Sequence, residues 1–343
     1  MALPMPPSDY SEPHYRNGYH PTEDFLPALA PDPPRQWRKL LFHVALFLAT
    51  LGTSTFFYTV LDGADPFTNP SSLLSGLPFS LPLMVILLSH EMGHYLLARK
   101  HRVQATLPYF IPGFPTFGAF IRMQSLPSDR CVLFDIGAAG PWAGVAATIP
   151  ALIIGLSLSE VQPLNPLDGG LYLGDSLLFL ALTQLVLGVS GSDVSIALHP
   201  TAFAGWFGLF VTFLNLLPVG QLDGGHVVYS LVGRLHRWVA RAFLVVIAVL
   251  GAHGWTGWFF WIGLLALLGI DHPPTRDFIS SLDPRRKVYA WCTVGLFILT
   301  FMPVPISQID PVDIPNAEKI PIAYLPHRFA ATQPHSFPLV YRP

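Results

Sequence analysis

Long apolar runs alternate along this chain with short polar or basic segments. A membrane-spanning helix needs about 20 predominantly apolar residues. Spans are therefore predicted over residues 40–61, 72–98, 134–158, 202–219 and 288–304. A further run, 239–270, is broken by glycine and polar residues at 252–257 and predicts two short spans joined by a turn. The run 176–189 is too short to span and predicts an interfacial or re-entrant helix. The pattern indicates an all-α polytopic membrane protein with six to seven transmembrane helices.

The segment between the second and third spans has a different pattern. Residues 107–112 and 117–123 are aromatic and β-branched, with Pro and Gly breaks between them. They predict two short strands that form a hairpin or small sheet dipping into the membrane. Non-helical backbone at that depth is tolerated only where it packs on protein or faces water.

Positive charge is distributed unevenly between the two ends of the predicted spans. Loops 62–71 and 159–200 contain acids but neither Lys nor Arg. Four basic clusters border the opposite ends: Arg35, Arg38 and Lys39; Arg99, Lys100 and Arg102; Arg234, Arg237 and Arg241; and Arg276, Arg285, Arg286 and Lys287. With seven spans, all four clusters fall on the side of the N-terminus, which the positive-inside rule places in the cytoplasm.

Composition supports the membrane class and divides the chain into three parts. Apolar residues make up 51% and charged residues 12%, whereas soluble domains carry about 25% charge. Residues 1–34 predict a disordered, proline-rich cytoplasmic tail, 35–304 a membrane-embedded domain, and 305–343 a C-terminal tail. Net charge is −2, so no nucleic-acid partner is indicated. The N-terminus lacks a transit-peptide composition, which favours a bacterial inner membrane, with a chloroplast membrane as the alternative.

The candidate chemistry begins with the pentapeptide His90-Glu91-Met92-Gly93-His94 near the end of the second span. His90 and His94 stand at i and i+4, so they lie on one helix face, about 6 Å apart along the axis. Two imidazoles at this spacing can bind one Zn²⁺, and Glu91 beside them can act on water. Ionisable residues inside a membrane helix are functional candidates.

A catalytic zinc needs a third protein ligand and an open position. Asp223 follows the fourth span on the same predicted side, and Gly224 and Gly225 after it would let backbone approach closely. His226 is the alternative ligand. Asp-Gly is also a common turn, so Asp223 acting only as a cap or turn residue is the remaining interpretation.

The segment from Asn215 to Gly224 reads Asn-Leu-Leu-Pro-Val-Gly-Gln-Leu-Asp-Gly. Together with the HEMGH pentapeptide, it resembles the site-2 protease family of intramembrane zinc metalloproteases, peptidase family M50. The resemblance covers about residues 75–235. It implies that His90, His94 and Asp223 bind one zinc ion, that Glu91 is the general base, and that Asn215 contacts the substrate or an oxyanion. Gly140-Pro141 also resembles the family pattern, but the usual following Asn is missing, so no role transfers there.

The resemblance implies hydrolysis of peptide bonds in or near transmembrane segments of membrane-protein substrates, in contact with lipid. No PDZ-like insert is visible, as in the compact branch that includes relatives of plant chloroplast homologues. Nothing in the sequence sets the oligomeric state. Proteases of prenylated proteins use a downstream Glu ligand, but Glu160 and Glu318 lie in predicted external segments. A non-catalytic metal-binding protein or transporter is the other alternative; it would not need Glu91, and no inverted repeat is visible.

Overall fold

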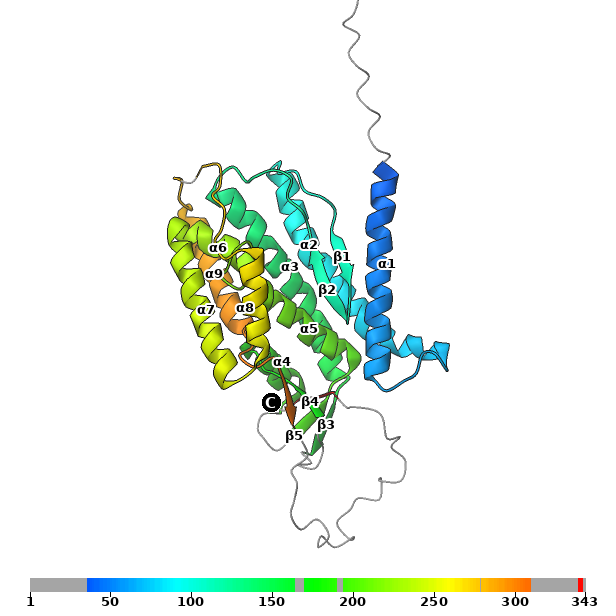
Figure 1. Cartoon of the computed structure of the whole chain (residues 1–343). Coiled ribbons are helices and arrows are strands. Elements are labelled where there is room, and N and C mark those ends of the chain that lie inside the picture. The colour runs from blue at the N-terminus through cyan, green and yellow to red at the C-terminus, as the bar shows by residue number, and fades with distance from the viewer. Residues whose placement is uncertain (1–35, 164–169, 190–193, 278, 310–338, 342–343) are drawn as a thin grey trace, which may run out of the picture. The chain divides into compact units, whose positions relative to one another are not determined.

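The computed structural model describes residues 36–163, 170–189, 194–277, 279–309 and 339–341 (Figure 1). The chain divides into two compact units, which are Met1–Leu41 and Phe42–Pro343. The described part of the first unit is the beginning of the first helix. The expected disorder of residues 1–34 lies outside the described residues.

Apolar helices make up most of the described chain. They are α1 (Gln36–Leu61), α2 (Leu77–Lys100), α3 (Arg130–Ser157), α4 (Leu177–Leu187), α5 (Pro200–Asn215), α6 (Asp223–Val232), α7 (His236–His253), α8 (Gly257–Leu268) and α9 (Pro284–Thr300), with 3-10 turns η1 (Pro70–Gly76) and η2 (Gly233–Leu235). Each helical run expected from the sequence appears within a few residues of its predicted bounds. The interruption predicted at 252–257 contains the break between α7 and α8.

Four helical stretches of the described residues are long and apolar enough to cross a membrane. They are Trp37–Leu61, Pro70–Lys100, Arg130–Ser157 and Asp223–His253. The chain is thus a mostly helical membrane protein. The expected six to seven spans exceed this number because α5, α8 and α9 have 16, 12 and 17 residues, fewer than the about 20 that a straight span requires.

Four helices position the candidate site. α2 packs against α3, and α3 also packs against α5 and α6. An aromatic cluster joins α2 and α5 near the start of each helix. The rings of Phe79 and Phe203 stack 5.1 Å apart, and Trp206 stacks on Phe203 at 5.9 Å. All three side chains are buried. This packing fixes α5, and therefore the loop that follows its end, relative to α2.

A two-stranded antiparallel sheet lies between α2 and α3 in sequence. β1 (Tyr109–Pro112) pairs with β2 (Thr116–Phe120), with Phe110 opposite Ala119. β1 lies beside α1, where His43 Nδ1 is 2.9 Å from the Pro108 carbonyl, and β2 contacts α2 (Figure 1). The hairpin therefore sits between the two helices, with β2 on the α2 side.

A second sheet corrects the expected all-α class. Its strands are β3 (Glu160–Pro163), β4 (Gly170–Leu173), β5 (Val194–Ala197), β6 (Ile306–Ile309) and β7 (Leu339–Tyr341), in the order β3-β5-β7-β4-β6. β4 and β7 run parallel, and the other neighbours are antiparallel. Sequence periodicity could not reveal this sheet, because each strand has only three or four residues and its partners are distant in the chain.

Candidate metal centre

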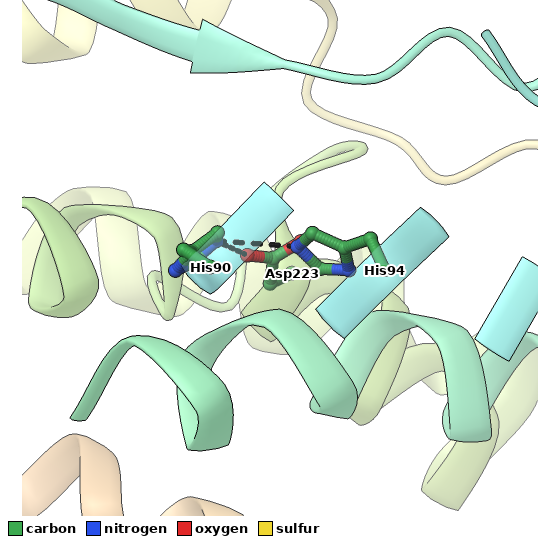
Figure 2. A group of neighbouring side chains, drawn as sticks. All are labelled: His90, His94 and Asp223. Carbon is green, nitrogen blue, oxygen red and sulfur yellow. Dashed lines mark hydrogen bonds and ion pairs between the residues drawn. The ribbon is translucent and has the colours of Figure 1, made fainter. Parts of the chain in front are cut away.

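The face of α2 that carries His90 and His94 is turned into the protein. Their exposed fractions are 3% and 7%, and their Nε2 atoms lie 3.2 Å apart. The i,i+4 spacing alone would leave the rings adjacent on the helix. Here both rings also turn toward the same side chain of another helix, Asp223 (Figure 2).

Asp223 is the first residue of α6 and enters the site from a loop that follows α5. Its Oδ2 lies 3.1 Å from His90 Nε2, and its Oδ1 lies 3.3 Å from His94 Nε2. The residue before it, Leu222, occupies the N-cap position. Asp223 itself therefore stands one residue past the cap, and its carboxylate faces the two histidines.

Tight backbone packing brings Asp223 to this position. A Cβ on Gly224 would overlap the carbonyl oxygen of Leu216, and one on Gly225 would overlap that of Gly220. Gly220 itself has φ +57°, and its N–H donates to the Ile270 carbonyl at 2.9 Å. Only residues without a Cβ allow the loop to fold back this closely against the start of α6.

The three donor residues fit a zinc ion. Atoms that bind one Zn²⁺ tetrahedrally at about 2.0–2.1 Å lie about 3.3 Å from one another. The imidazole and carboxylate separations of 3.1–3.3 Å match that value, and one donor atom from each residue lies within 4.8 Å of the others. Two histidines and one carboxylate form a donor set typical of catalytic zinc, which leaves one position open.

Neighbouring groups orient these donors. His94 Nδ1 donates to the carbonyl of Ile136 at 2.8 Å. A proton on Nδ1 leaves the lone pair of the neutral ring on Nε2, the atom that faces Asp223 and His90. Asn215, the last residue of α5, places its Nδ2 3.3 Å from His90 Nε2.

Glu91 lies in the same pocket without joining the three donors. Its side chain is 4% exposed and interacts with the backbone of Ile121, just beyond the end of β2. A cavity of about 180 Å³ opens there, and Glu91, Ile121 and Asn215 line it with the three donor residues. The structure thus brings all five residues singled out from the sequence into one cavity.

Three glycines of α3 make room for the histidines, a role that the sequence analysis did not assign to any of them. A Cβ on Gly140 would overlap the His94 ring, and one on Gly144 would lie 3.0 Å from His90 Nδ1. A Cβ on Gly137 would lie 2.7 Å from that of His226. Small residues at helical spacing in an apolar segment are the available sequence signal, because they let membrane helices approach closely.

His226, the alternative third ligand, takes a different partner. Its ring lines the cavity, but its Nδ1 lies 2.7 Å from His272 Nε2. His272 Nδ1 in turn donates to the Pro273 carbonyl at 2.5 Å, so His272 Nε2 accepts from His226. Among the described residues, the metal-ligand group contains Asp223 and not His226.

The fold and the site define a mostly helical membrane protein with a buried group of two histidines and one carboxylate whose donor atoms fit a metal ion. Residues 78–252 match peptidase family M50, so the chain belongs to that family.

Plant proteins are among its relatives. The chain is 30% identical over 308 residues to the probable zinc metalloprotease EGY1, chloroplastic, of Arabidopsis thaliana, covering 80% of this chain and 55% of that protein. It is 34% identical over 240 residues to the protein of the same name from Oryza sativa subsp. japonica, covering 67% and 41%. The probable zinc metalloprotease EGY2, chloroplastic, of Arabidopsis thaliana is 31% identical over 176 residues, covering 50% and 32%. The chain spans about half the length of the EGY1 relatives or less. These comparisons indicate zinc as the metal, and they do not support the expected bacterial inner membrane.

Proposed function

We propose that this chain is an intramembrane zinc metalloprotease that hydrolyses peptide bonds in or near transmembrane segments of membrane-protein substrates. The observation that carries the proposal is the convergence of His90, His94 and Asp223 on one point, with Glu91 in the same cavity. Membership of family M50 and the names of the relatives support it.

In this proposal His90, His94 and Asp223 hold one zinc ion per chain. Zinc in such a site activates water and polarises a scissile carbonyl. Glu91 accepts a proton from the attacking water and returns it to the leaving amide nitrogen. Its burial and its position outside the donor group suit a base that does not bind the metal.

Asn215 is proposed to bind the substrate carbonyl oxygen as negative charge develops on it. Its Nδ2 lies 3.3 Å from His90 Nε2, at the edge of the donor group. With zinc held by His90, His94 and Asp223, the Asn215 side-chain N–H would be a preorganised donor to the reacting oxygen.

The edge of β2 is proposed to receive the unwound substrate. A helical substrate has its amides locked in hydrogen bonds and must become extended before cleavage. β1 is the strand partner of β2 in its two-stranded sheet, and residues 119–121 line the catalytic cavity. Successive N–H groups of a strand point to opposite sides, so proline at one of Ala119 and Phe120 removes a backbone N–H from this edge and should reduce cleavage. Unchanged cleavage by both variants would eliminate this binding mode.

The proposal extends to the arrangement in the membrane. The proposed catalytic core is about residues 75–235 within a membrane domain of 35–304, and α5 and α9 are proposed to cross together with their adjoining loops. The end of α2 carries Arg99 and Lys100. Two spans, α1 and α2, separate this end from the N-terminus, so the end of α2 and the N-terminus are proposed to face the same compartment. The active centre then lies near that surface, with a short route for water.

The decisive experiment compares wild type with Glu91→Gln. Both proteins are purified in detergent, their zinc content is measured, and a transmembrane-helix substrate is added. Glu91→Gln should retain zinc and lose at least about 100-fold in cleavage, because it removes the base alone. A wild type that binds zinc stoichiometrically but cleaves no membrane-helix substrate would favour a non-catalytic metal-binding protein instead.

A further inference from the structure

A second cavity lies behind the wall of the catalytic cavity. It has a volume of about 350 Å³ and is formed by α6, η2, the start of α7 and the segment 271–274. The residues that line it include Tyr229, Arg234, His236, Arg237, Asp271 and His272. The hydrogen bond of 2.7 Å from His226 to His272 separates it from the catalytic cavity.

The charge balance of this pocket is positive. Arg234 and Arg237 line it and are exposed. Asp271 is the acidic residue of the lining, and the Arg241 guanidinium lies 3.1 Å from its carboxylate. The lining thus contains two arginines and one acid, and a residue outside the lining compensates that acid.

A buried polar atom at this pocket lacks a partner. His236 is 1% exposed, and its Nε2 makes no hydrogen bond within the described part of the chain. Leaving a buried polar group unpaired is costly, and native structures generally supply a partner. One short segment thus supplies three side chains with N–H donors to the lining of this cavity: Arg234, His236 and Arg237.

The surroundings of the pocket are apolar. Leu235 and Trp238, which are 62% and 60% exposed, alternate with the two arginines along the chain. The Arg237 guanidinium lies 5.5 Å from the centre of the Trp238 ring. Exposed tryptophan beside arginine is typical of the level of lipid headgroups, and basic pockets between membrane helices bind anionic headgroups.

We infer that this pocket binds a phosphate group, and that an anionic phospholipid headgroup supplies it. Arg234 and Arg237 bind the phosphate oxygens, His236 donates from Nε2, and Leu235 and Trp238 contact the acyl region. Arginine suits this role because its planar guanidinium matches phosphate oxygens. The site is separate from the proposed protease chemistry and does not depend on it.

The test measures retained lipid and does not measure cleavage. The full chain is reconstituted in nanodiscs of phosphatidylcholine with a minor fraction of phosphatidylglycerol, released into neutral detergent, and examined by native mass spectrometry. The pocket variant carries Arg234→Gln and Arg237→Gln. The matched control carries Arg285→Gln and Lys287→Gln, which remove equal charge from two exposed positions of α9 that do not line the pocket.

Wild type and the control should retain phosphatidylglycerol, and the pocket variant should bind it about 30-fold more weakly. Each arginine at a membrane surface contributes about a fivefold gain in anionic-lipid affinity. His236→Phe should also weaken retention, with no loss of thermal stability, because it removes an unpaired polar atom. Equal retention by the pocket variant and the control would overturn the inference.

A parallel titration with inorganic phosphate and glycerol phosphate distinguishes the source of the group. If a lipid headgroup occupies the pocket, neither inorganic phosphate nor glycerol phosphate should displace phosphatidylglycerol at millimolar concentration. If both bind wild type through Arg234 and Arg237 while phosphatidylglycerol is not retained, the assignment to a lipid is wrong.

Discussion

Two histidine clusters lie side by side in this protein and differ in one respect. In the candidate metal centre, the Asp223 carboxylate stands between His90 and His94, within 3.3 Å of both. In the neighbouring cluster, His226 and His272 bind each other, and Tyr229 stacks on His272 at 4.3 Å. The donor atoms of the first cluster face one point, whereas the two histidines of the second are hydrogen-bonded to each other. Convergence of donors, and not the number of histidines, distinguishes a metal site from a structural cluster.

Removing the carboxylate should have the largest effect. Asp223→Ala is expected to lower zinc affinity by more than about 100-fold, because outer-shell partners alone contribute about 10–100-fold. Cleavage should be lost with the metal. His272→Ala is the control in the second cluster and should retain zinc at the wild-type level. Zinc content after dialysis against a chelator measures both. Equal zinc loss in the two variants would remove the distinction between the clusters.

Asn215→Ala should separate catalysis from metal binding inside the first cluster. Zinc content is expected to remain unchanged, because Asn215 is outside the donor group. The turnover number should fall by about 100–1,000-fold, as for loss of one oxyanion donor. Single-turnover cleavage and zinc analysis of the same preparation provide the comparison. A loss of zinc that accounts for the loss of turnover would assign Asn215 to the metal.

The glycines of α3 should come next in effect. Gly140→Ala places a methyl group against the His94 ring, and Gly144→Ala places one against His90. Displacing a ligand in this way should weaken zinc binding by about 10–100-fold, with destabilisation of about 1–3 kcal/mol from overpacking. Gly295→Ala in α9 is the matched control, because its Cβ would meet no atom within 4 Å. Competition with a zinc indicator and thermal unfolding measure the two quantities. Normal zinc affinity in Gly140→Ala would contradict the close approach of α3 to His94.

The second cluster should make the stability of the folded protein depend on pH, because His272 is buried in it. Burial, reinforced by the neighbouring His226 and His236, lowers the pKa of His272 to about 3, against about 6.5 in an unfolded chain. The unfolded state therefore binds the proton first as pH falls. The contribution of neutral His272 is complete above about pH 6.5 and is lost progressively toward pH 3.

Replacing His272 should flatten this dependence. Wild type is expected to lose a few degrees in melting temperature between about pH 6.5 and 4.5, and His272→Gln should lose less. His253→Gln, at an exposed position, should leave the wild-type slope unchanged. Parallel curves for all three proteins would show that His272 is not held neutral by the fold.

Local patterns in the sequence predicted the helices and singled out the residues that the structure brings together at the candidate metal centre. His90 and His94 are linked by helix geometry, and Asp223 is a carboxylate after an apolar run, so each can be recognised from its own segment. Contacts between distant segments could not be predicted in this way. Gly140 matters only because α3 lies against His94, and His226 is hydrogen-bonded to His272, which is 46 residues away in the chain. The five-stranded sheet has the same cause, since β7 pairs with strands far earlier in the chain.

The most direct test of the central claim is X-ray absorption spectroscopy at the zinc edge on the purified full chain. Spectra are compared between wild type, His226→Ala and Asp223→Ala. The account predicts two imidazole ligands with oxygen in the remaining positions, the same spectrum in His226→Ala, and loss of bound zinc in Asp223→Ala. A third imidazole in wild type that disappears in His226→Ala would contradict it, because His226 and not Asp223 would then complete the site.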